Sequence, residues 1–139
     1  IHEGQAVTAA HRPLHAFEFD ATHCPDLFPA LAALAAAAEG VSTIRGTSRL
    51  EYKECNRADA IREEYAKAGI EVDISQEDVM RIRGGRIRAA RVQSHGDHRM
   101  AMSMAVAGLL SDGEMTIEDA ECVAKSYPGF FEDLEKIRI

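Results

Sequence analysis

The sequence predicts an α/β fold in which the helices are buried and the strands face the solvent. Three times a helical segment is followed by a glycine and then by a short strand, at Gly40, Gly69 and Gly113. Two of the helical segments, 27–38 and 100–110, are apolar nearly all round, which is typical of buried helices. The predicted strands carry charged residues on one face: Glu18, Arg45, Glu71, Asp73, Arg81 and Arg83. This pattern reverses the usual α/β arrangement, in which helices cover a buried sheet.

In chain order, the first four predicted elements are a strand, a helix, a strand and a helix. Strands are indicated by alternating apolar and polar residues, and helices by Pro at their start or Gly just after their end. By these signs the four elements cover residues 14–19, 26–39, 41–45 and 56–68. Pro25 and Pro29 open the first helix, and Asn56 is a favourable N-cap for the second.

A hairpin is predicted next, because residues 70–74 and 79–83 alternate again and are separated by a short polar stretch. Gly84-Gly85 then turns the chain. The remaining elements are a strand, an apolar helix, a strand and a short helix, at residues 91–93, 100–110, 115–117 and 130–137. The spacing of the helix–Gly–strand units is too uneven for a solenoid, so we expect one compact domain.

Length and composition restrict the class of protein. The chain has 139 residues and a formal net charge of −7, and no basic stripe offsets that charge, so we expect no nucleic acid partner. The longest apolar run, 27–38, is shorter than the ~20 residues that span a bilayer, so we expect a soluble protein with no membrane partner. Cys24, Cys55 and Cys122 are odd in number and widely spread, which predicts no disulfide framework and a cytoplasmic location. Ile1, in place of Met, suggests that the chain begins within a longer protein.

The most informative functional signal lies at the start of the apolar helix 100–110. His98 and Arg99 directly precede it and put two potentially cationic side chains in its first turn. A helix N-terminus already carries partial positive charge, and acidic residues normally stabilise it. We therefore predict a bound phosphate or carboxylate, held by His98, Arg99 and backbone amides.

Other charged residues also lie where a loop or strand meets a helix. Lys53, Glu54 and Arg57 surround one helix start, and these residues could equally be a capping segment with solvated charges. Asp26 could simply stabilise the start of its helix, and Lys125 could be an ordinary exposed loop lysine. Because such junctions gather on one edge of an α/β unit, the same residues could instead surround one small anion.

Metal and nucleotide sites are not expected. His95, Asp97 and His98 are spaced like metal ligands, but no matching cluster accompanies them. The segment 83–86 fits neither of the common phosphate-binding glycine loops and is interpreted as a turn.

Four motifs follow one another along the chain: Pro25-Asp26, Lys53-Glu54-Cys55-Asn56-Arg57, Asp97-His98-Arg99-Met100-Ala101-Met102 and Ala124-Lys125-Ser126-Tyr127-Pro128. Together they resemble the C-terminal domain of the 5-enolpyruvylshikimate-3-phosphate (EPSP) synthase family, from about Phe17 to the end. The resemblance implies two domains built of βαβαββ repeats, with helices inside, sheets outside and ligands between the domains. Residues 1–139 would then be a partial C-terminal domain with about two repeats, and the N-terminal domain would be absent from this chain.

The resemblance also implies a reaction. The enolpyruvyl group of phosphoenolpyruvate would be transferred to the 5-hydroxyl of shikimate 3-phosphate with release of phosphate, a step of aromatic amino acid biosynthesis and the target of glyphosate. No metal or organic cofactor is implied. Proton transfers at the hydroxyl and the methylene require positioned acids and bases, and the anionic substrate requires fixed positive charge.

Roles for individual residues follow from the same resemblance. Asp26 resembles the carboxylate that binds the shikimate hydroxyls and accepts the 5-hydroxyl proton, and Lys53 resembles its companion ligand. Glu54 resembles an acid/base group near the methylene of phosphoenolpyruvate. The residues that resemble the clamp on phosphoenolpyruvate are Arg57, Arg99 and Lys125, with His98 beside them and Lys125 also a candidate proton donor.

The chain departs from the family at Cys55-Asn56, where Ser or Thr followed by Asp is common. If that Asp orients Arg57, Asn56 would weaken the orientation. Because half of the cleft is missing, we expect the isolated chain to be inactive. Two alternatives are a related enolpyruvyl transferase acting on a UDP-sugar and an anion-binding module without catalysis. The pairing of Lys53, Glu54 and Arg57 with Asp97-His98-Arg99 favours the shikimate enzyme.

Overall fold

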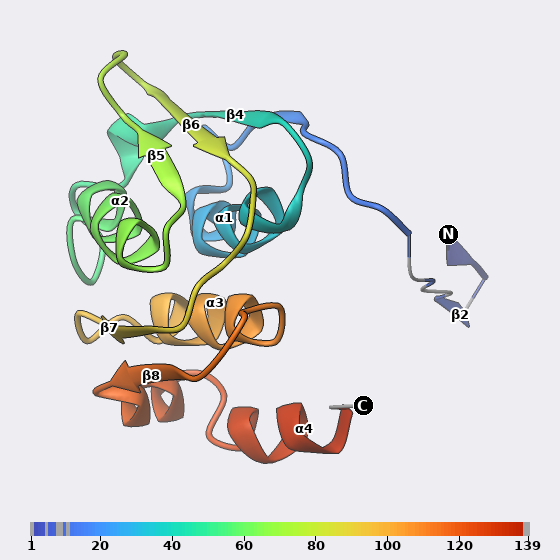
Figure 1. Ribbon diagram of the computed structural model, residues 1–139. Helices are drawn as coiled ribbons and strands as arrows, with labels where there is room; N and C mark the ends of the chain where they lie inside the picture. The colour runs from blue at the N-terminus through green and yellow to red at the C-terminus, as the bar shows by residue number, and fades with distance from the viewer. Residues whose placement is uncertain (1, 5, 8–9, 11, 138–139) are drawn as a thin grey trace.

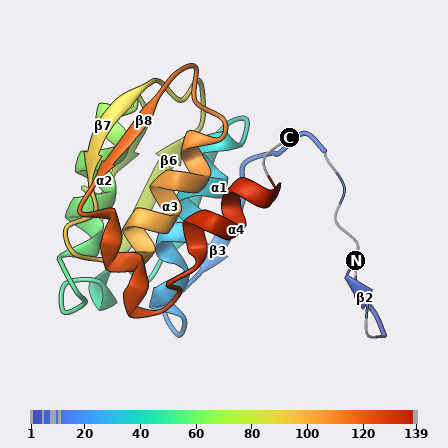
Figure 2. The same cartoon turned by 90° about the horizontal axis from the view of Figure 1, so that it is seen from below.

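A computed structural model describes residues 2–4, 6–7, 10 and 12–137. Its first elements are a short antiparallel pair, β1 (His2–Glu3) and β2 (Ala6–Val7), which lies apart from the rest of the molecule in both views (Figure 1, Figure 2). No helix within the described ranges is long and apolar enough to cross a membrane. The remaining elements, from residue 12 onward, form the body of the molecule, and the β1–β2 pair is not part of it.

Six elements form one complete βαβαββ unit. They are β3 (Glu18–Asp20), α1 (Phe28–Ala37), β4 (Val41–Arg45), α2 (Arg57–Lys67), β5 (Glu71–Asp73) and β6 (Val79–Arg83). The strands make one sheet in the order β3-β4-β6-β5, in which β3 is parallel to β4 and the other neighbours are antiparallel. The predicted hairpin of the last two strands is confirmed.

A second unit starts in the same way. It consists of β7 (Ala90–Gln93), α3 (His98–Gly108), β8 (Met115–Glu118) and α4 (Phe130–Ile137), and β7 and β8 pair in parallel. Short 3-10 turns precede α1 (η1, Pro25–Leu27), follow β4 (η2, Thr47–Arg49) and follow β8 (η3, Ala120–Lys125). The described residues thus hold one complete unit and the first four elements of another.

The helices α1, α2 and α3 lie between the four-stranded sheet and the β7–β8 pair (Figure 1). Ile44 and Ile82 of the sheet belong to the same hydrophobic core as the helix side chains Tyr65 and Met104, and all four are fully buried. On the outer face of the sheet, Glu71 and Arg83 form an exposed ion pair, with the Arg83 Nε 3.1 Å from a carboxylate oxygen. The predicted arrangement of buried helices and solvent-facing strands is confirmed.

Gly84 lets the chain leave the sheet against the end of α1. A Cβ at this position would lie 1.8 Å from the carbonyl oxygen of Ala38, whereas a Cβ at Gly85 would meet nothing within 4 Å. The predicted turn at these glycines is therefore chiefly a close approach of two backbone segments at Gly84.

Three predicted boundaries were wrong. Residues 14–19 form a strand only from Glu18, because the pairing with β4 begins there, and Phe19 is too exposed for a half-buried strand. The helix expected from Asp26 begins as a 3-10 turn and becomes α-helical at Phe28. The helix expected at 100–110, with Gly113 after it, begins at His98 and ends at Gly108.

The two apolar helices are not covered all round by the described residues. Leu34 of α1 and Val106 of α3 are exposed, at 42% and 43%. Between the two helices runs an open, largely apolar groove of about 250 Å³, and Asp26 and Arg99 line it together with apolar side chains.

Candidate functional site

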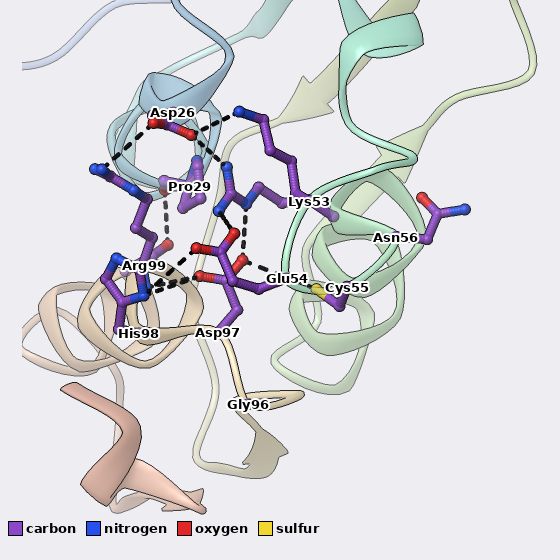
Figure 3. A network of polar contacts seen from close by, with 12 residues as sticks. Asp26, Pro29, Lys53, Glu54, Cys55, Asn56, Gly96, Asp97, His98 and Arg99 are labelled. Carbon is purple, nitrogen blue, oxygen red and sulfur yellow. Dashed lines mark hydrogen bonds and ion pairs between the residues drawn. The ribbon is translucent and has the colours of Figure 1, made fainter. Parts of the chain in front are cut away.

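The seven predicted site residues lie together at one edge of the helix layer. Figure 3 labels five of them: Asp26, Lys53, Glu54, His98 and Arg99. They come from the ends of elements: η1, the loop before α2, the first turn of α2, the first turn of α3 and the end of η3. The residues are Asp26, Lys53, Glu54, Arg57, His98, Arg99 and Lys125. Because helix starts converge here, unpaired backbone N–H groups add to the positive potential of this edge.

Arg57, the first residue of α2, is the centre of the cluster, and its side chain is fully buried. Its guanidinium group donates to three carboxylates: Nη1 to Asp26 at 3.0 Å, Nη2 to Glu54 at 2.8 Å and Nε to Asp97 at 2.8 Å. Burial alone would lower the pKa of Arg57, but the hydrogen bonds to Asp97 and Asp26 raise it above its ordinary value. Arg57 is therefore held in its charged form and joins three segments that are distant in sequence.

Asp97 is the residue of the cluster to which sequence reasoning gave no role in the site, although it counted Asp97 as a possible metal ligand and as part of a family motif. It is the N-cap of α3, and its Oδ1 accepts the backbone N–H of Arg99 at 2.9 Å while its Oδ2 accepts from Arg57. The side chain is fully buried. An acidic residue that stabilises this helix start is thus present in the chain itself. The preference for Asp at the N-cap was the sequence signal that could have identified it.

The other three cations lie at the rim of the cluster and are held more loosely. Lys53 Nζ lies 3.1 Å from Asp26 Oδ1, Arg99 Nη2 lies 3.4 Å from Asp26 Oδ2, and Lys125 Nζ lies 3.7 Å from Glu54 Oε1. The Lys125 side chain is 60% exposed. With Arg57, four cationic side chains face three carboxylates, so the cluster keeps an excess positive charge on its open side.

Asp26 is the most accessible of the three carboxylates, with a side chain that is 48% exposed. Partial burial acts to raise its pKa, but hydrogen bonds from Arg57 and Lys53 and the charge of Arg99 outweigh that effect and lower it. Asp26 therefore stays ionised and is suited to accept hydrogen bonds from hydroxyl groups.

His98 carries an unsatisfied polar atom. Its Nδ1 is buried and has no hydrogen-bond partner among the described residues, and it lies 3.8 Å from Glu54 Oε1 and 4.0 Å from Asp97 Oδ1. These three residues are close enough to share a metal ion. Arg57 and Lys125 contact the same carboxylates, however, and their charges disfavour a divalent cation there.

Asn56 caps α2 and does not orient Arg57. Its Oδ1 accepts the backbone N–H of Asp59, and in Figure 3 its side chain points away from the cluster. Asp26, Glu54 and Asp97 hold the guanidinium group of Arg57 instead. The neighbouring Cys55 has its pKa raised to about 11, first by burial and then by Asp97, and its thiol stays neutral.

Comparisons with known proteins identify relatives of this chain. A family model described as EPSP synthase (3-phosphoshikimate 1-carboxyvinyltransferase) matches residues 1–134. A 3-phosphoshikimate 1-carboxyvinyltransferase of Methanocella arvoryzae is 45% identical over 131 residues, which is 94% of this chain and 31% of that protein. One of Methanopyrus kandleri is 42% identical over 137 residues, which is 99% of this chain and 32% of that protein. The chain thus spans about a third of the length of these curated relatives.

Solved structures show the same fold. An EPSP synthase from Acinetobacter baumannii superimposes with a TM-score of 0.75 and 36% identity, over 81% of this chain and 27% of that one. The enolpyruvyl transferase NikO from Streptomyces tendae superimposes with a TM-score of 0.68 and 25% identity, over 92% of this chain and 29% of that one.

Proposed function

Because this chain belongs to the EPSP synthase family, we propose that the full-length protein transfers the enolpyruvyl group of phosphoenolpyruvate to the 5-hydroxyl of shikimate 3-phosphate and releases phosphate. The observation that carries this proposal is the single cluster that all seven expected residues form with Asp97, in which three carboxylates face four cations and the excess of cations lies at the open side. An anion-binding module needs the cations, whereas an acid/base reaction also needs the carboxylates.

In this proposal, phosphoenolpyruvate binds at the rim, where Arg99 and Lys125 are accessible and only loosely paired. An arriving phosphate or carboxylate would compete for them with Asp26 and Glu54, and it would gain charge-assisted hydrogen bonds. The unsatisfied Nδ1 of His98 is buried beside Glu54 and Asp97, so it offers a further hydrogen bond only to a ligand that displaces one of these carboxylates.

Arg57 plays a different part from the rim cations. Three of its five N–H donors already serve Asp26, Glu54 and Asp97, so contact with phosphoenolpyruvate requires the remaining donors or the displacement of a carboxylate. Its main contribution in the free protein is to set the positions of the acid/base groups.

Proton transfer is assigned to Asp26, Glu54 and Lys125. Asp26 accepts the proton of the 5-hydroxyl while Lys53 binds the same substrate. Since the pKa of Asp26 is lowered by Arg57 and Lys53, its basicity rises when a substrate draws either cation away. In this proposal Glu54 and Lys125 exchange a proton with the methylene carbon, and the 3.7 Å between their charged atoms supports a shared role.

In this proposal, the rest of the full-length protein lies opposite the cluster and encloses the substrates from the other side. The exposed Leu34 and Val106 suit cover by further helices of the same domain, and the N-terminal domain would supply the remaining contacts to shikimate 3-phosphate. A cytoplasmic location fits the reaction. No nucleic acid, membrane or cofactor enters the proposal.

The test is an assay of the full-length protein with phosphoenolpyruvate and shikimate 3-phosphate, following phosphate release and the mass of the product. We expect turnover within the ordinary enzymatic range of ~1–10³ per second. Exchange of Arg62 for Gln on the outside of α2 is the control and should keep that rate, because Arg62 pairs only with the exposed Asp59 in the described contacts. Turnover with a UDP-sugar and none with shikimate 3-phosphate would contradict the proposal.

A further inference from the structure

Glu64 is a buried charged residue outside the cluster described above. Its side chain is fully buried on α2, and its carboxylate accepts hydrogen bonds from Lys67 at 2.8 Å to each oxygen and from the backbone N–H of Gln93 at 2.9 Å. The Nε2 of His95 lies 2.7 Å from its Oε1. Burial alone would raise the pKa of Glu64, but these hydrogen bonds lower it, so the group stays ionised.

The partners of Glu64 lie in the connection that leads into α3. His95 (φ 56°) and Gly96 (φ 68°) are both in the left-handed region, which is uncommon for His, and Ser94 Oγ accepts the backbone N–H of Gly96 at 3.1 Å. This tight turn delivers Asp97, the N-cap of α3 and a partner of Arg57.

α2 therefore holds this connection at two points. Arg57 and Glu64 are seven residues apart and so lie on the same side of the helix. Arg57 binds Asp97, and Glu64 binds the turn that precedes it. Glu63, Glu64 and His95 are also close enough together for a metal ion, but Lys67 occupies both oxygens of Glu64 and opposes a cation.

We propose that Glu64 and His95 are positioning residues. Their hydrogen bond holds the turn before α3 in place, and this turn sets the positions of Asp97, His98 and Arg99 at the start of the helix. Neither residue touches substrate. The effect on catalysis rests on the proposed function, whereas the effect on the turn does not.

The kinetic test uses the full-length protein with His95 replaced by Phe, Gln or Gly. Phe keeps a ring but cannot bind Glu64, and we expect kcat/KM for phosphoenolpyruvate to fall roughly 10–100-fold, as for a slightly misplaced binding group. KM for shikimate 3-phosphate should change less than about twofold, which general destabilisation would not produce. Gln can donate to Glu64 and should restore most of the activity. Gly accepts the left-handed backbone without strain but cannot bind Glu64, and it should remain defective.

The matched control is the same exchange at His15, which is 74% exposed and far from the site in sequence. His15→Phe should behave as the wild type. Wild-type kinetics for His95→Phe, or full activity for His95→Gly, would overturn the proposal. A defect in His95→Gln equal to that of Phe would overturn it too.

A second measurement separates this inference from the proposed function. Hydrogen exchange of the Arg99 amide, which donates to Asp97, should be roughly tenfold faster in His95→Phe than in the wild type or His15→Phe. If the wild-type protein shows no turnover, the proposed function fails, but the hydrogen exchange rate still tests the positioning role of Glu64 and His95. An unchanged exchange rate of the Arg99 amide in His95→Phe would refute that role.

Discussion

At the scale of single residues, Arg57 determines the geometry of the site because it joins carboxylates from three segments. Asp26 lies 31 residues before it, Glu54 three residues before it and Asp97 40 residues after it. The sequence predicted Arg57 as a site residue, and in the structure Arg57 lies at the centre of the cluster. Its complete burial depends on contacts between distant segments, which no local pattern reports.

Removing the charge of Arg57 should be costly to stability. Arg57→Met leaves the fully buried Asp97 without its cation, and we expect a loss of about 3–5 kcal/mol in the free energy of unfolding. Denaturant titration of the two proteins measures the difference. The control Arg62→Met, on the same helix, removes an exposed ion pair and should cost less than about 1 kcal/mol. Equal losses of unfolding free energy in Arg57→Met and Arg62→Met would show that the buried ion pairs of Arg57 stabilise the fold no more than an exposed pair does.

Arg99 is expected to act on the ligand more than on the fold. Its side chain is partly exposed and its contact with Asp26 is long at 3.4 Å. In the full-length protein, Arg99→Ala should weaken binding of phosphoenolpyruvate roughly 10–100-fold, the equivalent of a lost charged hydrogen bond. Titration calorimetry and a thermal melt measure the two effects separately. A collapsed fold with normal affinity in the surviving protein would mean that Arg99 is structural.

At the scale of elements, local sequence signals predicted most helices and strands. They failed where the hydrogen-bond pairing of two strands sets the length of an element. The strands 41–45 and 79–83 and the helix start at Asn56 agree with the structure, because alternation and capping are local properties. The strand at 14–19 was predicted too long, because its extent is set by the register of Glu18 against Thr43. The sequence could have identified Asp97 as the N-cap of α3, but it could not predict the contact of Asp97 with Arg57, which is 40 residues away.

Gly84 offers a test of how the sheet meets α1. Gly84→Ala would place a Cβ against the backbone oxygen of Ala38, which is not the end of a flexible side chain, so we expect a loss of about 3 kcal/mol or more. Gly85→Ala is the neighbouring control, because open space surrounds its Cβ position. Thermal melts of both variants measure the difference in stability. A Gly84→Ala protein as stable as Gly85→Ala would contradict the close approach of residue 84 to the backbone of Ala38.

At the scale of the whole molecule, the proposed function assigns the described residues to one side of a cleft. We expect residues 1–139 alone to release phosphate from phosphoenolpyruvate and shikimate 3-phosphate at a rate negligible beside the ordinary ~1–10³ per second, because nothing encloses the substrates. The phosphate assay applied in parallel to the chain and to the full-length protein measures this. Comparable rates would show that the second side is dispensable.

Glu64 should make the stability of the molecule sensitive to acid. Its pKa lies below the ordinary 4.5, because the hydrogen bonds from Lys67, Gln93 and His95 outweigh burial. Its contribution to folding is therefore complete above about pH 4.5 and is lost as the pH falls through its folded-state pKa. Melting curves between about pH 3 and pH 7 should show Glu64→Gln less stable than wild type near neutrality, with the gap closing in acid. A gap that is constant with pH would exclude this origin.

The β7–β8 pair has a consequence for handling the protein. Within the described ranges these two parallel strands pair only with each other, so their outer edges keep backbone groups available for another strand, apart from the N–H of Gln93, which donates to Glu64. The exposed ion pair between Arg91 and Glu118 gives the sheet some protection, since charges at an edge discourage stacking of chains. A polypeptide cut to these bounds is thus prone to form intermolecular β-sheet, and its preparation at high concentration calls for neighbouring segments that complete the sheet.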